Sequence, residues 1–131
     1  MADRWRTVLL TWSIGLIGTA SVSTHHSVAG QFDPSQPLTL TGVVSKVDWV
    51  NPHIYVYLDV ADEQGVVTTW TWETVPTAMA RRAGLTRESF LGAGKPVTIE
   101  GIAGRKADLH LGFVYKITFA DGRYVQLSAP R

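Results

Sequence analysis

The sequence predicts a mainly β domain: a small closed barrel of five strands, with one helix between the third and fourth strands. After residue 37, apolar side chains alternate along runs rich in β-branched and aromatic residues, as in half-buried strands. This alternation is interrupted once, between residues 74 and 92, by a pattern with helical spacing. The 131 residues suffice for one domain but not for two ordinary ones. A six-stranded sandwich or roll is the alternative.

The first 23 residues have the organisation of a signal peptide, which we expect to be helical. Met1 to Arg6 contains two arginines, Thr7 to Ala20 contains no charge, and small residues continue to Ser23. A retained membrane anchor is the alternative, but a spanning helix needs about 20 apolar residues, and polar residues return sooner here. We therefore expect cleavage, a periplasmic or secreted product, and no stable membrane span afterwards.

The sequence leaves the position of the cleavage open. Small residues precede a cut after Ala20 and also a cut after Ser23, whereas a cut before His25 would follow the less suitable Thr24. Residues 24–37 are expected to form an extended leader, because Pro34 and Pro37 interrupt regular structure. The barrel domain is then expected to span residues 38–131.

The first expected strand runs from Leu38 to Trp49. Its apolar residues change from one face to the other at Gly42. A glycine at such a change predicts a bulge or a sharp bend, and a small closed barrel needs strongly bent strands.

The second and third strands are expected at residues 53–60 and 66–73. Along the second, alternate residues from Ile54 to Val60 are apolar, whereas the residues between them include two tyrosines and an aspartate. Trp70 and Trp72 share one face of the third strand. The turn sequence at residues 62–65 predicts that these two strands are neighbours.

A helix is expected next, capped by Thr74, with Pro76 in its first turn. Arg81 and Arg82 fall in its last turn, and Gly84 ends it. A second short helical turn is expected from residue 86.

The remaining strands are expected at residues 95–102 and 113–119. Asp121-Gly122 is a strong signal for a two-residue hairpin turn, which joins the last of these strands to an arm at residues 124–127. Three strands, a helix, two strands and a C-terminal hairpin give the order of an OB-fold barrel.

Composition excludes several classes of protein. From Ser21 onward ten Lys and Arg residues balance ten Asp and Glu residues, so the excess positive charge that nucleic-acid binding requires is missing. The chain has no cysteine, which excludes disulfides and thiolate sites. No catalytic triad or phosphate-binding loop occurs. Glu73 is the best-placed acid but has no evident partner, so we expect no enzyme unless folding brings a second polar group to Glu73 or His53.

The segment Asn51-Pro52-His53 lies between two expected strands. One interpretation is a simple turn, because Asn and Pro are turn formers. The other is a binding loop, because loops of barrels hold ligand groups. We therefore predict a non-catalytic binding or accessory module for an unknown small ligand or protein, with Trp49, Asn51, His53 and Tyr55 as ligand-binding residues.

The alternative function is copper binding through His25 and His26. A cut close to these residues would place a free α-amino group beside two imidazoles, and nitrogen donors suit Cu²⁺ in a square-planar site. His53 could complete the ligand set. The competing interpretation is that both histidines belong to a polar leader and bind no metal, so that the protein has no cofactor.

Several blocks of the chain resemble a family of small exported bacterial proteins catalogued as a domain of unknown function, family 6152. The resemblance implies export and no established activity. The chain is also similar, more distantly, to periplasmic bacterial OB-fold proteins. Two departures concern Thr24, where the family usually has alanine, and residues 105–110, where it usually has a polar, glycine-rich loop. The matching blocks are His25-His26-Ser27, Phe32-Asp33-Pro34, residues 40–44, residues 47–53 (which end in Asn51-Pro52-His53), residues 81–90, residues 97–101 and Asp121-Gly122-Arg123.

Overall fold

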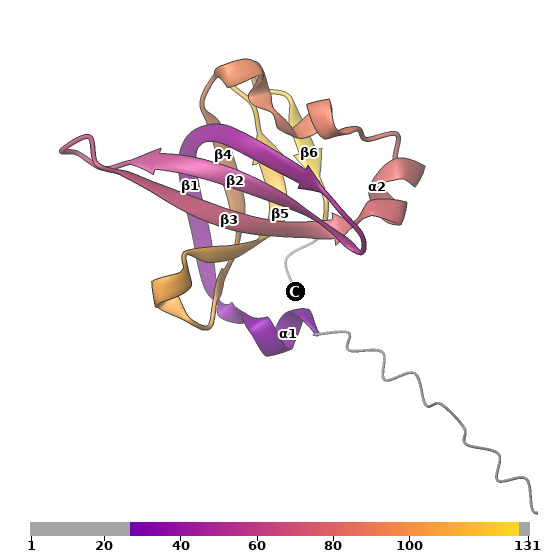
Figure 1. The fold of residues 1–131 in the computed structure, drawn as a ribbon, viewed down its shortest axis with the longest axis horizontal. Helices are drawn as coiled ribbons and strands as arrows, with labels where there is room; N and C mark the ends of the chain where they lie inside the picture. Colours follow the sequence, from indigo (N-terminus) through magenta and orange to yellow (C-terminus); the bar gives the residue numbers. More distant parts are fainter. Residues whose placement is uncertain (1–26, 129–131) are drawn as a thin grey trace, which may run out of the picture.

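A computed structural model describes residues 27–128 of the chain, and the fold is mainly β, as predicted. The expected signal peptide, His25 and His26 lie outside the described residues. Within residues 27–128 no helix is long and apolar enough to cross a membrane. The elements are α1 (Val28–Gln31), β1 (Phe32–Trp49), β2 (His53–Ala61), β3 (Val67–Pro76), α2 (Thr77–Arg82), the 3₁₀ turns η1 (Arg87–Phe90) and η2 (Gly92–Gly94), β4 (Val97–Gly104), the 3₁₀ turn η3 (Ala107–Leu109), β5 (Leu111–Thr118) and β6 (Tyr124–Gln126) (Figure 1).

The six strands form one sheet in the order β3-β2-β1-β4-β5-β6, and neighbours in this order run antiparallel. In addition, β3 pairs with β5 in parallel, from Thr71 opposite Leu111 to Glu73 opposite Phe113. The pairings of β1 to β5 therefore form a closed circuit, and β6 extends from β5 outside it.

Gly42 is the point at which β1 changes its partner. Residues 37–42 of β1 pair with β4, whereas residues 43–49 pair with β2. A Cβ atom at Gly42 would overlap the backbone carbonyl of Asp59, so only glycine allows this close approach. The bend at this change of partner is visible in Figure 1 as the arch of β1. The apolar face does not change at Gly42 as predicted, because Val44, which has the parity of Leu38 and Leu40, is buried whereas Val43 is exposed. The face changes farther along the strand, between Val44 and Val47. The irregularity in the pairing with β2 lies between Val44 and Lys46.

The main core fills the space that the circuit encloses. Ile54, Val56 and Leu58 of β2 are fully buried, as the alternation predicts, and the side chain of Trp72 packs among them. A second cluster joins Phe32 to Ile102 and Phe113, with the two phenyl rings 5.5 Å apart. The start of β1 therefore closes one end of the domain.

Three further details differ from the sequence prediction. The expected cap Thr74 is wrong: it is a buried residue of β3, and Pro76 precedes the helix because β3 stays paired with β2 as far as His53 opposite Pro76. Strand β1 begins at Phe32, before the expected residue 38. In β5 the alternation breaks, since Val114 and Ile117 both enter the main core where the pairing of β4 with β5 shifts.

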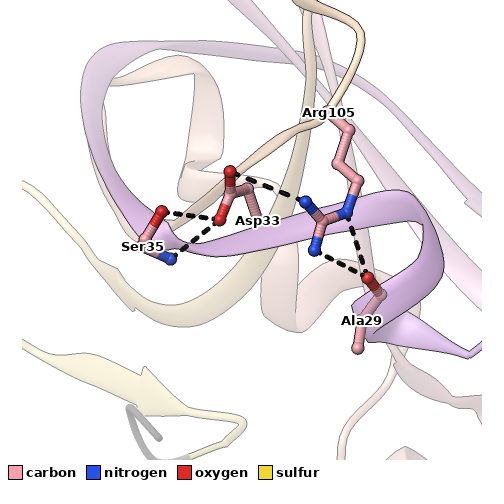
Figure 2. A network of polar contacts seen from close by, with 4 residues as sticks. All are labelled: Ala29, Asp33, Ser35 and Arg105. Carbon is pink, nitrogen blue, oxygen red and sulfur yellow. Dashed lines mark hydrogen bonds and ion pairs between the residues drawn. The ribbon is translucent and has the colours of Figure 1, made fainter.

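The helical turn α1 is attached to the sheet by Arg105, as Figure 2 shows. The guanidinium donates two hydrogen bonds, of 3.1 and 3.0 Å, to the carbonyl of Ala29 and lies 3.7 Å from the Asp33 carboxylate. The Arg105 N–H donates to the carbonyl of Gln31 at 2.9 Å. Hydrogen bonds from Ser35, with the charge of Arg105, lower the pKa of Asp33.

Candidate functional site

The turn between β1 and β2 is fastened to the beginning of α2. The Thr77 hydroxyl donates to the Asn51 amide oxygen at 2.5 Å, and the Thr77 N–H donates to the carbonyl of Pro52 at 3.0 Å. The peptide bond between Asn51 and Pro52 is cis. The amide oxygen of Asn51, a predicted ligand-binding residue, is therefore engaged in holding the turn.

The side chains of His53 and Glu73 meet on the outer face of the sheet. His53 opens β2, and Glu73 lies on β3 opposite Tyr55, one diagonal step away. The Nδ1 atom of His53 contacts Oε1 of Glu73, and both side chains are largely buried, with 21% and 12% of their surface exposed. Nδ1 is itself buried and has no partner besides this carboxylate. The carboxylate therefore fixes the ring orientation and leaves Nε2 as the ring nitrogen for an external ligand.

Two tyrosines continue this face along β2. Burial, the neighbouring charge of Glu73 and the neighbouring Tyr57 raise the pKa of Tyr55. Burial and the hydrogen bond to Asp48 raise the pKa of Tyr57, whose hydroxyl donates to Oδ2 of Asp48 at 3.1 Å. Both residues are thus neutral hydroxyl donors near neutral pH.

Lys46 completes the polar surface beside Tyr57. Its Nζ lies 2.8 Å from Oδ2 of Asp48 and 5.0 Å from the centre of the Tyr57 ring. The hydrogen bond from Lys46, followed by that from Tyr57, lowers the pKa of Asp48. The positive charge of Lys46 is therefore already balanced by the carboxylate of Asp48.

Trp49 does not join His53 and Tyr55. It pairs with the buried Ile54, packs against the main core and meets Phe90 edge-on at 6.1 Å. The structure thus brings together His53 and Tyr55 of the predicted set, fastens Asn51 to α2 and directs Trp49 to the core. Glu73 joins the site, although no partner for it was evident in the sequence.

No three-residue metal cluster forms within residues 27–128. No group of three or more His, Cys, Asp or Glu side chains in this range could hold a metal ion. Besides His53, the range contains only His110, whose ring lies 5.1 Å from that of Trp70. The predicted metal ligands His25 and His26 lie outside the described residues.

Two surface clefts lie away from the imidazole–carboxylate pair. The larger, of about 1040 Å³, separates the segment containing η1 and η2 from the hairpin of β5 and β6, and Leu85, Lys95, Phe119 and Tyr124 are among its lining residues. The smaller, of about 560 Å³, lies between α1 and the segment of η3. Of the predicted site residues, those within residues 27–128 line neither cleft.

These features define a small mainly β domain with a group of interacting polar side chains on the outer face of β1, β2 and β3. The chain belongs to a family of unknown function (DUF6152), whose model matches residues 15–111. The match confirms the resemblance that the sequence motifs indicated, and it includes His53 and Glu73. A search of curated proteins finds no match to the chain.

Proposed function

We propose that this protein is an exported, non-catalytic binding or accessory module built on a five-stranded OB-like barrel. The circuit of pairings supports the barrel, because β1 pairs with β2 and β4, and β3 pairs with β5. The order of three strands, a helix and two strands is that of the OB fold. The arginines and uncharged segment of residues 1–20 support export to the periplasm or the medium.

The observation that carries the binding proposal is the His53–Glu73 pair. Burying an ion pair is seldom a net gain in stability, since both groups lose hydration. Here the pair lies beside the neutral hydroxyl of Tyr55 and next to a turn fastened by Thr77. An oriented imidazole and a phenol on a rigid surface are suited to fixing a ligand.

Catalysis is the weaker interpretation, even though a second polar group does meet His53. An imidazole held by a carboxylate is a competent general base. A reaction also needs a site that shields the substrate from water, whereas a ligand can be held on an open surface. His53 and Glu73 lie on the outer face of the sheet, away from the two clefts described above. We therefore retain binding as the function.

The experiment uses ¹⁵N-labelled mature protein and the dialysable fraction of a bacterial periplasmic extract. Amide shifts are expected at residues 51–55 and 73, and the variant His53→Ala should abolish them. The variant His110→Ala is the matched control, because it removes the other described histidine and should leave the shifts unchanged. Shifts that persist in His53→Ala, or no shifts in the native protein, would overturn the proposal.

Copper binding is the second candidate, and one specific observation favours it. Histidines that ligate metals usually donate their other ring N–H to a carboxylate, which fixes the ring and raises its basicity. His53 and Glu73 have this arrangement. The ligands would be the new α-amino group, His25, His26 and Nε2 of His53, a nitrogen set that suits Cu²⁺.

The test is mass spectrometry of the mature amino terminus followed by Cu²⁺ titration. His25→Ala, His26→Ala and His53→Ala should each weaken binding, and Glu73→Gln should weaken it by about 10- to 100-fold through loss of the orienting contact. His110→Ala should leave the affinity unchanged. A mature chain that begins at Ser21, or weak binding unaffected by these variants, would exclude the copper site.

A further inference from the structure

The polar surface continues from His53 along the whole outer side of β2. Strand register places its residues in cross-strand rows, and hydrogen bonds between neighbouring strands confirm that the side chains share one face. We call this surface the tyrosine face. It consists of Lys46 and Asp48 on β1, His53, Tyr55, Tyr57 and Asp59 on β2, and Thr69, Thr71 and Glu73 on β3.

Two of the three carboxylates of the tyrosine face are paired within the face itself. Lys46 pairs with Asp48 at 2.8 Å, and His53 pairs with Glu73. The hydroxyl of Thr69 donates to Oδ1 of Asp59 at 2.6 Å. A phosphate-bearing ligand would meet three carboxylates, a lysine that is already engaged, and Arg87 of η1, whose charge acts on Lys46 and Asp48. The face therefore has no surplus of positive charge for a polyanion.

The face has a surplus of hydrogen-bond acceptors. An ionised carboxylate offers about four acceptor sites. Asp59 accepts one hydrogen bond from a side chain, and Glu73 is contacted only by His53 among charged groups. The remaining acceptor sites of both carboxylates suit a ligand that supplies hydrogen-bond donors. Hydroxyl groups supply such donors without carrying charge.

The aromatic rings supply apolar contact between these acceptors. Tyr55 and Tyr57 occupy successive outward positions of β2, and both are partly exposed. Aromatic side chains combine a rigid apolar surface with a polar tip. The C–H surface of a sugar ring can lie on such rings while its hydroxyls reach the flanking carboxylates.

The dimensions favour a linear ligand. From His53 to Asp59 the strand rises by about 20 Å, at ~3.3 Å for each residue. Polar residues lie beside the middle of this length on both neighbouring strands, whereas Pro76 lies opposite His53 on β3 and Val43 lies opposite Asp59 on β1. The ligand would therefore lie along β2 and contact several successive rows.

From these features we propose that the tyrosine face binds a linear, neutral oligosaccharide along β2. This inference rests on the proposed binding function and names its ligand class. His53 and Tyr55 would contact one end of the oligosaccharide, and Tyr57 and Asp59 would contact the other.

The experiment titrates the mature protein separately with cellohexaose, chitohexaose and maltohexaose and follows amide shifts. At least one of the three should shift residues of β2 and β3. Tyr57→Ala should weaken that binding about tenfold, whereas Tyr57→Phe should keep most of it. Tyr124→Ala removes an exposed tyrosine outside the face, 65% exposed, and should leave the affinity unchanged.

The absence of shifts with all three oligosaccharides would overturn this inference, as would shifts confined to the cleft beside the β5–β6 hairpin. These failures are distinguishable from failure of the binding proposal. If the extract fraction still shifts residues 51–55 in a His53-dependent way, the ligand class alone is wrong. Equal loss of affinity in Tyr57→Ala and Tyr124→Ala would also contradict binding along β2.

Discussion

Trp72 occupies the centre of the core because two glycines leave room for its ring. Trp72 is fully buried, and a Cβ atom added at Gly101 or at Gly112 would meet its six-membered ring. At Gly112 the added atom would lie 2.6 Å from Cζ3 and 2.8 Å from Cδ2 of the tryptophan. Such distances are far inside van der Waals contact, and the enclosed ring has no space into which it can move.

We therefore predict that Gly112→Ala destabilises the protein by about 1–3 kcal/mol, the usual range for an overpacked core. Denaturant unfolding monitored by tryptophan fluorescence would measure the loss. Gly30→Ala is the control, because its added methyl group would contact only the Ser27 hydroxyl, at 3.2 Å, and the site is exposed. The control should change stability by less than about 0.5 kcal/mol. Equal effects in the two variants would show that the core accommodates the methyl group.

At the candidate site, the sequence revealed the residue types but not which of them meet. The alternation of β2 correctly places His53 and Tyr55 on one face, because side-chain direction follows parity within a strand. Trp49 is near them in sequence but lies across the turn, with its side chain on the core face opposite Ile54. The His53–Glu73 contact depends on the irregularity between His53 and Tyr55 in the pairing of β2 with β3, and no local pattern in the sequence marks that irregularity.

At the scale of elements, composition and periodicity predicted the order of the strands and the hairpin turn. Boundaries were less predictable where pairing extends a strand beyond its apolar pattern. Thr74 has the chemistry of a helix cap, but its strand is still paired with β2, and the helix starts only at Thr77. Similarly, Pro34 and Pro37 predict the end of regular structure, yet β1 already begins at Phe32, whose ring is buried against Phe113.

The attachment of α1 gives a prediction for this element. Arg105→Ala removes two hydrogen bonds to Ala29 and the charge beside Asp33, so amide exchange at residues 28–32 should rise. Global stability should fall by no more than about 1 kcal/mol, because half-exposed ion pairs and single hydrogen bonds contribute little. Hydrogen exchange with mass spectrometry measures the first effect, and thermal unfolding measures the second.

Arg105→Lys should fail to restore protection, because lysine cannot reproduce the two-pronged contact with one carbonyl. Arg123→Ala is the matched control: Arg123 pairs only with Asp121, two residues away, and its side chain is 78% exposed. This control should leave residues 28–32 unchanged. Full protection of these residues in Arg105→Ala would mean that the burial of Phe32 alone holds α1.

At the scale of the whole molecule, the parallel pairing of β3 with β5 could not be predicted from the residue pattern of either strand. It joins residues that are about forty positions apart in the chain, such as Thr71 and Leu111. Without it, β3 would be a free edge of the sheet; with it, each of β1 to β5 has a partner on both sides. The strand β6, of three residues, pairs only with β5.

This arrangement predicts two levels of protection against hydrogen exchange. Opening any strand of the circuit breaks two sets of pairings around a shared core, so hydrogen-bonded amides of β1 to β5 should exchange only with global unfolding. Amides of β6 should exchange through a local opening of much lower free energy, because its loss leaves the circuit intact. Native-state hydrogen exchange at increasing denaturant separates the two levels. The informative amides are those of residues 71–73 and 111–113, which should exchange as slowly as the other hydrogen-bonded amides of β1 to β5. If they exchange as quickly as β6, the junction between β3 and β5 opens independently, and the sheet behaves as an open one with β3 at its edge.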